Sequence, residues 1–315
     1  MAASDFAVPT PARPLRLGTR RSPLAMRQAE MVADALRAVH RLADEAVMLV
    51  PMTASGDVVQ DRPLAEIGGK ALWTRELDKA LAAGAIDAAV HSMKDVETIR
   101  PTEFRIAAML PRADVRDRLI GAESVAALPT GATVGTASPR RAAQLKALRP
   151  DLAITLFRGN VATRLAKIDA GEADATLLAA AGLERLGIAR GAPIAVDAML
   201  PAPAQGAIGV EACAGREELC AFLAAIDDAD THGCISAERG LLYCLGADCH
   251  SPVAALAVCE RGGIRLRAQL LAEDGSAEVR GETRFAPGDR DAPETLAADL
   301  LARAPDAVRR LFAGA

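Results

Sequence analysis

Two short stretches of the chain, 15–23 and 132–141, share one pattern, and this repeat constrains the fold more than any other sequence feature. Each stretch contains an apolar run, a Gly-Thr pair and then a Ser-Pro pair that precedes a helical pattern. Serine is a preferred N-cap residue and proline suits the first turn of a helix, so each Ser-Pro pair predicts a helix start. The repeat therefore predicts two similarly built α/β domains.

Short apolar runs alternate with longer helical patterns as far as residue 211, which is typical of α/β domains with largely parallel sheets. The expected strands are 15–18, 46–52, 88–91, 132–135, 153–157 and 175–178. The expected helices are 22–38, 74–83, 139–148, 163–170 and 180–186. After about residue 225 the pattern predicts a separate α+β domain. Its elements are a helix at 231–245, antiparallel strands at 253–260, 264–272 and 277–285, and a helix at 293–312.

The composition is that of an ordinary globular protein, with 51% hydrophobic residues, 25% charged residues and a net charge of −4. We therefore expect no nucleic-acid or membrane partner. The chain of 315 residues is long enough for two or three domains. The first residues do not resemble a signal peptide, and we expect a cytoplasmic protein. The six cysteines lie between 213 and 259 without a CxxC pair, and we expect them to be reduced thiols.

Arginines cluster at three predicted helix starts, the third of which Asn160 or Thr163 could cap. Cations are normally disfavoured there, because the N–H groups and the dipole of a helix start attract anions. Bound carboxylates would offset this cost, and the planar guanidinium group suits them. The alternative is that these arginines are solvated surface charges. The residues concerned are Arg20 and Arg21, Arg140 and Arg141, and Arg158 and Arg164.

Asp95 ends the segment His-Ser-Met-Lys-Asp at 91–95, which follows an apolar strand. Open α/β sheets bind ligands at the carboxyl ends of their strands. Asp95 could act there as a general acid or stabilise a developing cation, although a turn or cap aspartate is the alternative. Lys70 follows two glycines, but the spacing of a phosphate-binding loop is absent.

Cys249 lies in a loop just after a predicted helix, where a thiol can act as a nucleophile. Cys244 and Cys259 fall in helix and strand patterns, so we interpret them as core residues. A zinc site is disfavoured because the spacing of its possible ligands is irregular. These possible ligands are His232, Cys234, Cys249 and His250.

Several segments, in sequence order from about residue 15 to the C-terminus, resemble the porphobilinogen deaminase family. They are Thr-Arg-Arg-Ser-Pro-Leu-Ala at 19–25, Gly-Gly-Lys at 68–70, His-Ser-Met-Lys-Asp at 91–95, Gly-Thr-Ala-Ser-Pro-Arg-Arg at 135–141, Arg-Gly-Asn-Val-Ala-Thr-Arg-Leu at 158–165 and Gln-Gly-Ala-Ile-Gly at 205–209. The resemblance implies a hydroxymethylbilane synthase, a transferase of porphyrin and heme biosynthesis. Such an enzyme condenses four porphobilinogen molecules head to tail with loss of ammonia and releases the linear tetrapyrrole with water.

The resemblance also implies a fold of two α/β domains like those of periplasmic binding proteins, with the chain returning to the first domain after the second. A third, small α+β domain with a three-stranded antiparallel sheet and helices would anchor the cofactor. The expected divisions are a disordered lead-in at 1–14, domain 1 at 15–109 plus 207–224, domain 2 at 110–206 and domain 3 at 225–315.

By the same resemblance, Cys249 carries a dipyrromethane cofactor through a thioether, and Asp95 is the catalytic carboxylate. The residues implied in cofactor binding are Cys249, Ser138, Arg140, Arg141, Lys94 and Asp95. Those implied in substrate binding are Arg20, Ser22, Lys70, Arg158, Arg164 and Arg185. We expect a monomer and, given the irregular spacing of the possible ligands, no metal.

The sequence departs from the family pattern at several positions. The cofactor cysteine is flanked by Asp248 and His250 where Gly and Gln are usual, and Trp73 replaces Phe. Glu66 replaces a frequent lysine, and Glu97 replaces a proline that commonly follows the aspartate motif. Two other interpretations are a degenerate family member that does not load its cofactor and a two-domain anion-binding protein without catalysis.

Overall fold

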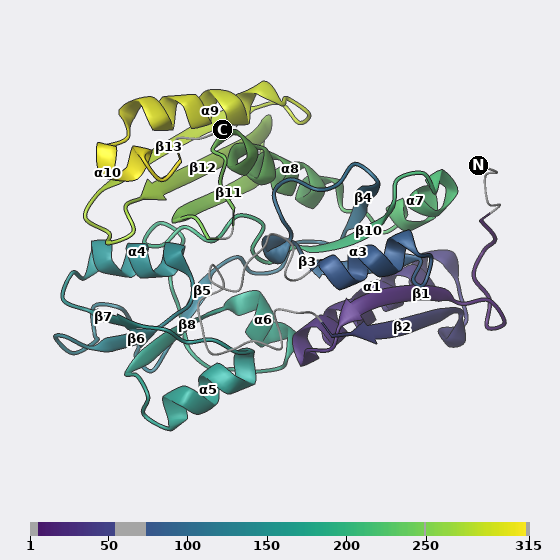
Figure 1. The fold of residues 1–315 in the computed structure, drawn as a ribbon, viewed down its shortest axis with the longest axis horizontal. Helices are drawn as coiled ribbons and strands as arrows, with labels where there is room; N and C mark the ends of the chain where they lie inside the picture. The colour runs from purple at the N-terminus through teal and green to yellow at the C-terminus, as the bar shows by residue number, and fades with distance from the viewer. Residues whose placement is uncertain (1–5, 54–73, 249, 313–315) are drawn as a thin grey trace. The chain divides into compact units, whose positions relative to one another are not determined.

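The computed structural model describes residues 6–53, 74–248 and 250–312, and the chain divides into two compact units (Figure 1). Unit 1 contains residues up to 112 and residues 207–232, and unit 2 contains residues 113–206 and those from 233 onward. Within the described residues, each unit holds a five-stranded mixed sheet, and unit 2 also holds a three-stranded antiparallel sheet. The predicted α/β class is confirmed, and the bounds of the three expected domains stay a prediction.

In unit 1 the strand order is β2-β1-β3-β10-β4. Strand β1 is parallel to both of its neighbours, and β10 is antiparallel to β3 and β4. The strands are β1 (Leu15–Arg20), β2 (Val47–Met52), β3 (Ala88–Ser92), β4 (Phe104–Met109) and β10 (Ile208–Cys213). The helices of this unit are α1 (Pro23–His40), α3 (Arg75–Ala82), α7 (Glu217–Ala224) and the 3₁₀ turns η1 (Asp44–Ala46) and η3 (Met93–Asp95).

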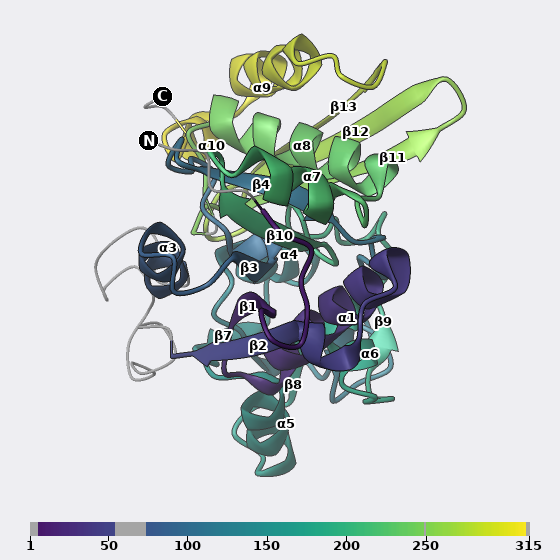
Figure 2. The same cartoon turned by 90° about the vertical axis from the view of Figure 1, so that its right-hand side faces the viewer.

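Two apolar clusters hold the helices of unit 1 to its sheet. Val32 of α1 and Leu223 of α7 belong to the same buried cluster as Leu17 of β1. Leu77 of α3 belongs to a second cluster with Phe104, and Figure 2 shows α1 and α3 on opposite sides of the strands. Both faces of the sheet are therefore covered, as expected for parallel strands rich in apolar residues.

Phe6, the first residue that the structure describes, packs against unit 1. Its backbone N–H donates to Glu218 Oε2 at 2.9 Å, and its ring lies 5.1 Å from that of Phe222, centroid to centroid. The sequence predicts a disordered lead-in at 1–14. Of this segment, the structure describes residues 6–14.

The five-stranded sheet of unit 2 has the order β7-β6-β8-β5-β9. Strand β6 is parallel to both neighbours, and β5 is antiparallel to β8 and β9, so this sheet repeats the arrangement of unit 1. Its strands are β5 (Asp117–Ile120), β6 (Thr133–Gly135), β7 (Ala153–Thr155), β8 (Ala175–Ala179) and β9 (Ala192–Pro193). Its helices are α4 (Pro139–Leu148), α5 (Val161–Asp169) and α6 (Ala180–Arg185).

The remainder of unit 2 is built on the three-stranded sheet, with strand order β11-β12-β13. Residues of α8 and α9 share one buried cluster with this sheet. The elements are α8 (Ala229–Cys244), which starts in unit 1, β11 (Val253–Glu260), β12 (Gly263–Leu271), β13 (Glu278–Phe285), α9 (Asp291–Arg303) and α10 (Asp306–Arg309). None of the described helices has the length and apolar character needed to cross a bilayer.

Several sequence predictions need correction. The single helix expected at 293–312 is wrong, because it breaks at Ala304, whose φ of −65° and ψ of 134° are extended. The following residue, Pro305, disfavours a helical conformation in the residue before it. The sequence patterns also do not predict β4, β5, β9, β10 or α7. Strands β5 and β10 follow the points where the chain passes between the units, and neither pairs with the strand next to it in chain order.

The repeated helix starts are confirmed. Ser22 Oγ accepts a hydrogen bond from Ala25 N at 3.3 Å, and Ser138 Oγ accepts one from Arg141 N at 3.4 Å. The glycine of the second repeat allows close packing, because a Cβ added to Gly135 would lie 2.3 Å from the ring of Phe157. Glycine is therefore required at this position by space and not by its backbone angle.

We expect Gly135→Ala to lower the free energy of unfolding by roughly 1–3 kcal/mol, because the ring of Phe157 is buried and must move. Gly215→Ala is the matched control, since no described atom lies within 4 Å of the added carbon. Urea unfolding followed by circular dichroism measures both. Equal midpoints for the two variants would contradict the packing argument.

Candidate active site

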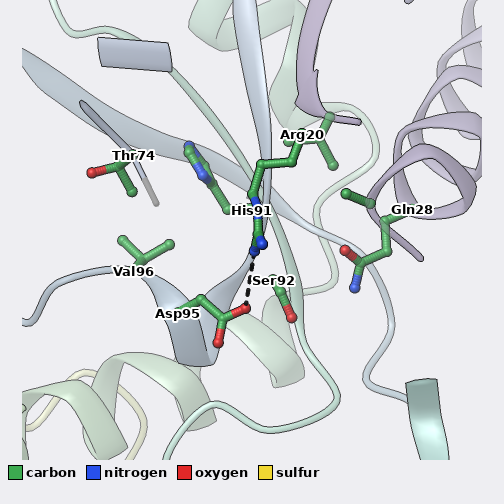
Figure 3. A pocket seen from close by; sticks show the side chains of 9 residues that line it. Arg20, Gln28, Thr74, His91, Ser92, Asp95 and Val96 are labelled. Atoms are coloured by element: carbon green, nitrogen blue, oxygen red, sulfur yellow. Dashed lines mark ion pairs between the residues drawn. The ribbon is translucent and has the colours of Figure 1, made fainter. Parts of the chain in front are cut away.

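A small pocket opens at the carboxyl ends of β1 and β3 in unit 1 (Figure 3). Arg20 is the last residue of β1, and Asp95 ends the turn η3 that follows β3. Because β1 and β3 are parallel neighbours, the two residues lie at the same edge of the sheet, where α/β folds bind ligands. The pocket is lined by Arg20, Ala25, Gln28, Thr74, Val90, His91, Ser92, Asp95 and Val96.

Arg20 and Asp95 form a loose ion pair in this pocket, with 3.8 Å between Nη1 and Oδ2. Both side chains are partly exposed, at 21% and 36%. Charge-assisted hydrogen bonds are shorter, at about 2.7–2.9 Å, and partly solvated pairs contribute little to stability. The geometry therefore leaves the carboxylate and the guanidinium group able to interact with a ligand.

Gln28 is a pocket residue that the sequence analysis missed. Its side chain is buried, and within the described part of the chain its Nε2 has no hydrogen-bond partner. A buried donor without an acceptor is costly, and a ligand oxygen in the pocket would offset that cost. The sequence feature that could have indicated Gln28 is its position in α1. This polar residue interrupts the buried apolar stripe formed by Ala25, Ala29 and Val32.

Behind the pocket, the carboxylate of Glu211 is fully buried on β10 and hydrogen-bonds to His91. His91 Nε2 lies 3.0 Å from Glu211 Oε2, and Arg100 donates from Nε and Nη2 at 2.9 and 2.8 Å. Burial raises the pKa of Glu211, but the hydrogen bonds from His91 and Arg100 outweigh burial and lower the pKa to about 2. An ionised carboxylate only accepts, so His91 Nε2 carries a proton.

Arg100 also ties the segment after Asp95 to α3. It donates to Asp78 Oδ1 at 2.6 Å and to Glu97 Oε2 at 2.8 Å. Thr74 Oγ1 donates to the other oxygen of Glu97 at 2.8 Å. Glu97, which replaces the proline usual in the resembled family, is therefore held by two partners. The sequence feature that could have indicated this hydrogen-bond network is Glu211, a carboxylate inside the otherwise apolar strand β10.

We expect acid to weaken unit 1 through Glu211. Its folded pKa of about 2 lies below its ordinary value of 4.5, so its contribution is fully present above pH 4.5 and is lost as the pH falls towards 2. The loss amounts to about 3 kcal/mol in the free energy of unfolding. Urea unfolding between pH 7 and pH 2 should show a smaller acid decline for Glu211→Gln than for the wild-type chain.

The control for this measurement is Glu45→Gln, since Glu45 is exposed in the same unit. Its acid decline should match that of the wild type. The free energy of unfolding of Glu211→Gln could instead fall as steeply as that of the control between pH 5 and pH 2. That result would exclude Glu211 as a source of the pH dependence.

In unit 2, Arg140 and Arg141 are buried at the start of α4 and bind one carboxylate, that of Asp117 on β5. Arg140 Nη2 lies 2.9 Å from Asp117 Oδ2, and Arg141 Nη2 lies 2.7 Å from Oδ1. Burial alone raises the pKa of Asp117, but the two guanidinium groups hold it far below its usual range. An internal carboxylate thus pairs with the two arginines that are predicted to bind a ligand. The sequence pattern does not indicate Asp117, because it does not predict β5.

The other predicted residues of unit 2 lie on α4, α5 and α6. Ser138 is the N-cap of α4. Arg158 is buried just before α5, and Arg164 on α5 donates from Nε to Gly159 O at 3.0 Å. Asn160, and not Thr163, caps α5. Arg185 ends α6 and donates from Nη2 to Gly206 O at 2.7 Å, and burial lowers its pKa to about 10, so it remains a cation at neutral pH.

Of the predicted residues in unit 1, the structure brings Arg20 and Asp95 together. Ser22 caps α1, and Lys94 lies half-buried in η3 beside Asp95. Lys70 and Cys249 lie outside the described residues, as do Glu66 and Trp73.

The surroundings of the predicted anchor are partly described. Asp248 Oδ1 accepts from His250 N at 2.8 Å, so this departure from the resembled family closes a local turn. Cys259 is exposed and Cys244 is half-buried, so the interpretation of Cys259 as a core residue is wrong. Cys259 is the last residue but one of β11, where the sheet meets solvent. Over the ranges that the structure describes, no cluster of three His, Cys, Asp or Glu side chains could hold a metal ion.

Comparison with known proteins gives consistent matches. Residues 15–221 match the family model "Porphobilinogen deaminase, dipyromethane cofactor binding domain", and residues 233–303 match "Porphobilinogen deaminase, C-terminal domain". A porphobilinogen deaminase of Sphingopyxis alaskensis is 58% identical over 311 residues, covering 96% of this chain and 98% of that protein. The one from Paracoccus denitrificans is 49% identical over 304 residues, covering 95% and 97%.

Among solved structures, the chain is similar to the periplasmic aliphatic sulphonate binding protein of Escherichia coli. The TM-score is 0.38 and the sequence identity is 17%, over 73% of this chain and 69% of that one.

Proposed function

Because the chain belongs to the porphobilinogen deaminase family, we infer that Asp95 is its catalytic carboxylate and that Cys249 carries its dipyrromethane cofactor. Membership makes the chain a hydroxymethylbilane synthase, a transferase of tetrapyrrole biosynthesis. It joins four porphobilinogen molecules head to tail with loss of ammonia, and water releases the linear product. The observation that carries the assignment of Asp95 is its place beside Arg20 in the pocket at the ends of β1 and β3.

Asp95 can act on the substrate in two ways. As the amino group of porphobilinogen departs, it takes up a proton and positive charge develops on the pyrrole. A carboxylate at this place can relay that proton and stabilise that charge, and electrostatic stabilisation of this kind is usually a large part of catalysis. The ionised Glu211 behind the pocket holds His91 in place, so the pocket wall is set before substrate binds.

The arginines and serines suit the acetate and propionate groups of cofactor and substrate. In the described part of unit 2, Nε of Arg140, Arg141 and Arg185 is buried without a hydrogen-bond partner, so their guanidinium groups have donor capacity left. This donor set fits a ligand with several carboxylates. When bound, the dipyrromethane supplies the pyrrole end to which new units are joined.

We assign Ser138, Arg140, Arg141 and Lys94 to the carboxylates of the cofactor. We assign Arg20, Ser22, Arg158, Arg164 and Arg185 to those of the substrate, together with Lys70, which lies outside the described residues. A bound carboxylate at the start of α4 or α5 also interacts favourably with the helix dipole.

We further propose that the enzyme works as a monomer in the cytoplasm, with porphobilinogen as its small-molecule partner and without nucleic acid or membrane. The net charge of −4, with basic and acidic residues mixed along the chain, supports the absence of a nucleic-acid or membrane partner.

Denaturing intact-mass spectrometry tests the anchor. We expect the purified wild-type chain to carry an adduct equal to two porphobilinogen units less two ammonia. Cys249→Ser should lack this adduct because a hydroxyl is a far weaker nucleophile than a thiolate. Cys244→Ser is the matched control and should keep it.

A bare chain mass for the wild type that stays unchanged after incubation with porphobilinogen would instead support the degenerate or binding-only interpretation. If the adduct persists in Cys249→Ser, the cofactor is attached to a residue other than Cys249.

We expect Asp95→Asn to keep the fold and the adduct but to lower kcat by about 10²–10⁴-fold, because an amide neither relays the proton nor stabilises the cation. Asp44→Asn is the control, since Asp44 is exposed in the same unit. The assay is the rate of hydroxymethylbilane formation by protein whose adduct has been verified by mass. Turnover near that of the wild type would remove Asp95 from the mechanism.

A further inference from the structure

Two cysteine thiols face each other where α8 meets β11 in unit 2. The Sγ atoms of Cys234 and Cys259 are 3.7 Å apart. Cys234 is 5% exposed, whereas Cys259 is exposed to solvent. One cysteine of the pair is therefore an exposed residue at the surface, and the sulfur of the second, buried cysteine lies 3.7 Å from its sulfur.

The packing around the pair holds the two elements together. Cys234 and Ile264 belong to the same buried core, and Ile264 is the pairing partner of Cys259 across β11 and β12. Gly233 precedes Cys234 and lets α8 approach, because a Cβ at this residue would lie only 3.3 Å from Ile264 Cδ1. The short sulfur distance thus arises at a well-packed junction and not between two mobile surface side chains.

We propose that Cys234 and Cys259 are a redox-active pair that a hydroperoxide converts to a reversible disulfide. The Cys259 thiolate attacks the peroxide, whose O–O bond breaks to give a sulfenic acid and one water or alcohol. The Cys234 thiol then attacks the Cys259 sulfur, the S–O bond breaks and a second water leaves. Two thiols are oxidised by two electrons, the peroxide is reduced, and a thiol reductant reverses the change by exchange.

The geometry of the pair is compatible with closure. A disulfide bond is about 2.05 Å long, so the two sulfur atoms must approach by roughly 1.6 Å for the bond to form. Within the described part of the chain, the pair belongs to no cluster of three residues that could hold a metal ion.

The other described thiols are placed less favourably. Cys213 Sγ donates to Leu81 O and Cys220 Sγ donates to Cys213 O, and burial raises the pKa of both thiols. Burial also raises the pKa of Cys244. Because the thiolate is the reactive form, these three residues should react more slowly with peroxide.

The bond would enclose the segment that contains position 249. Cys234 and Cys259 are 25 positions apart, and the segment between them includes most of α8 and most of β11. A crosslink of this span restricts the unfolded chain, so the oxidised form should resist thermal unfolding and proteolysis better than the reduced form. The inference does not depend on the role proposed for Cys249.

The test uses the enzyme with its cofactor attached. The protein is treated with hydrogen peroxide, denatured, alkylated with N-ethylmaleimide and analysed by intact mass and peptide mapping. We expect a loss of about 2 Da with neither thiol of the pair alkylated, a crosslinked peptide that contains both residues, and full reversal by dithiothreitol. Cys213→Ser is the matched control and should give the same crosslink.

Cys259→Ser should stay fully reduced at the same peroxide dose. Three results would overturn the proposal: complete alkylation of both thiols in the treated wild type, oxidation of Cys259 to a sulfinic acid with Cys234 still alkylated, or an equal yield of disulfide in Cys259→Ser. The wild-type measurement is decisive even if a variant fails to fold.

Discussion

The buried carboxylate of Asp117 holds unit 2 together at the point where most of its predicted binding residues lie. It accepts from Arg140 and Arg141 at the start of α4, and from Gln205 Nε2 at 2.9 Å in the segment that leads to the chain crossing. Arg140 also donates to the backbone oxygen of Leu200, so the same group of bonds fixes that segment. A buried charge of this kind is tolerated only when it is fully paired, and removing one partner is strongly destabilising.

Unit 1 also has a buried, paired carboxylate, at the equivalent strand of its five-stranded sheet. In each five-stranded sheet the fourth strand is antiparallel and follows a passage of the chain between the units, and that strand carries the buried acid. Glu211 on β10 holds His91 and Arg100, as Asp117 on β5 holds its two arginines. Because breaking a buried ion pair leaves a charge without a partner, each buried acid holds its partner side chains in place. His91 is an example, since its ring lines the pocket that contains Asp95.

The parts of the site that the sequence predicted are those that local rules control. Ser22 and Ser138 cap their helices as expected, and Asp95 lies at the end of a parallel strand beside Arg20. The parts that it did not predict depend on partners distant in sequence. The acceptor for Arg140 is 23 positions away, and the acceptor for Arg100 on β10 is 111 positions away. Nothing in the sequence near either arginine indicates which carboxylate it meets.

The sequence by itself determined the α/β class, the repeated strand-to-helix starts, the position of the catalytic aspartate candidate and the resemblance to a family. Each of these depends on short patterns whose physics is local: caps, turns and apolar periodicity. Only the tertiary structure decided that Asp117 meets the arginines of α4, that Gln28 lines the pocket, and that Cys234 lies beside Cys259. These contacts arise when sheets close with strands from distant parts of the chain, and such non-local pairing depends on how whole elements pack.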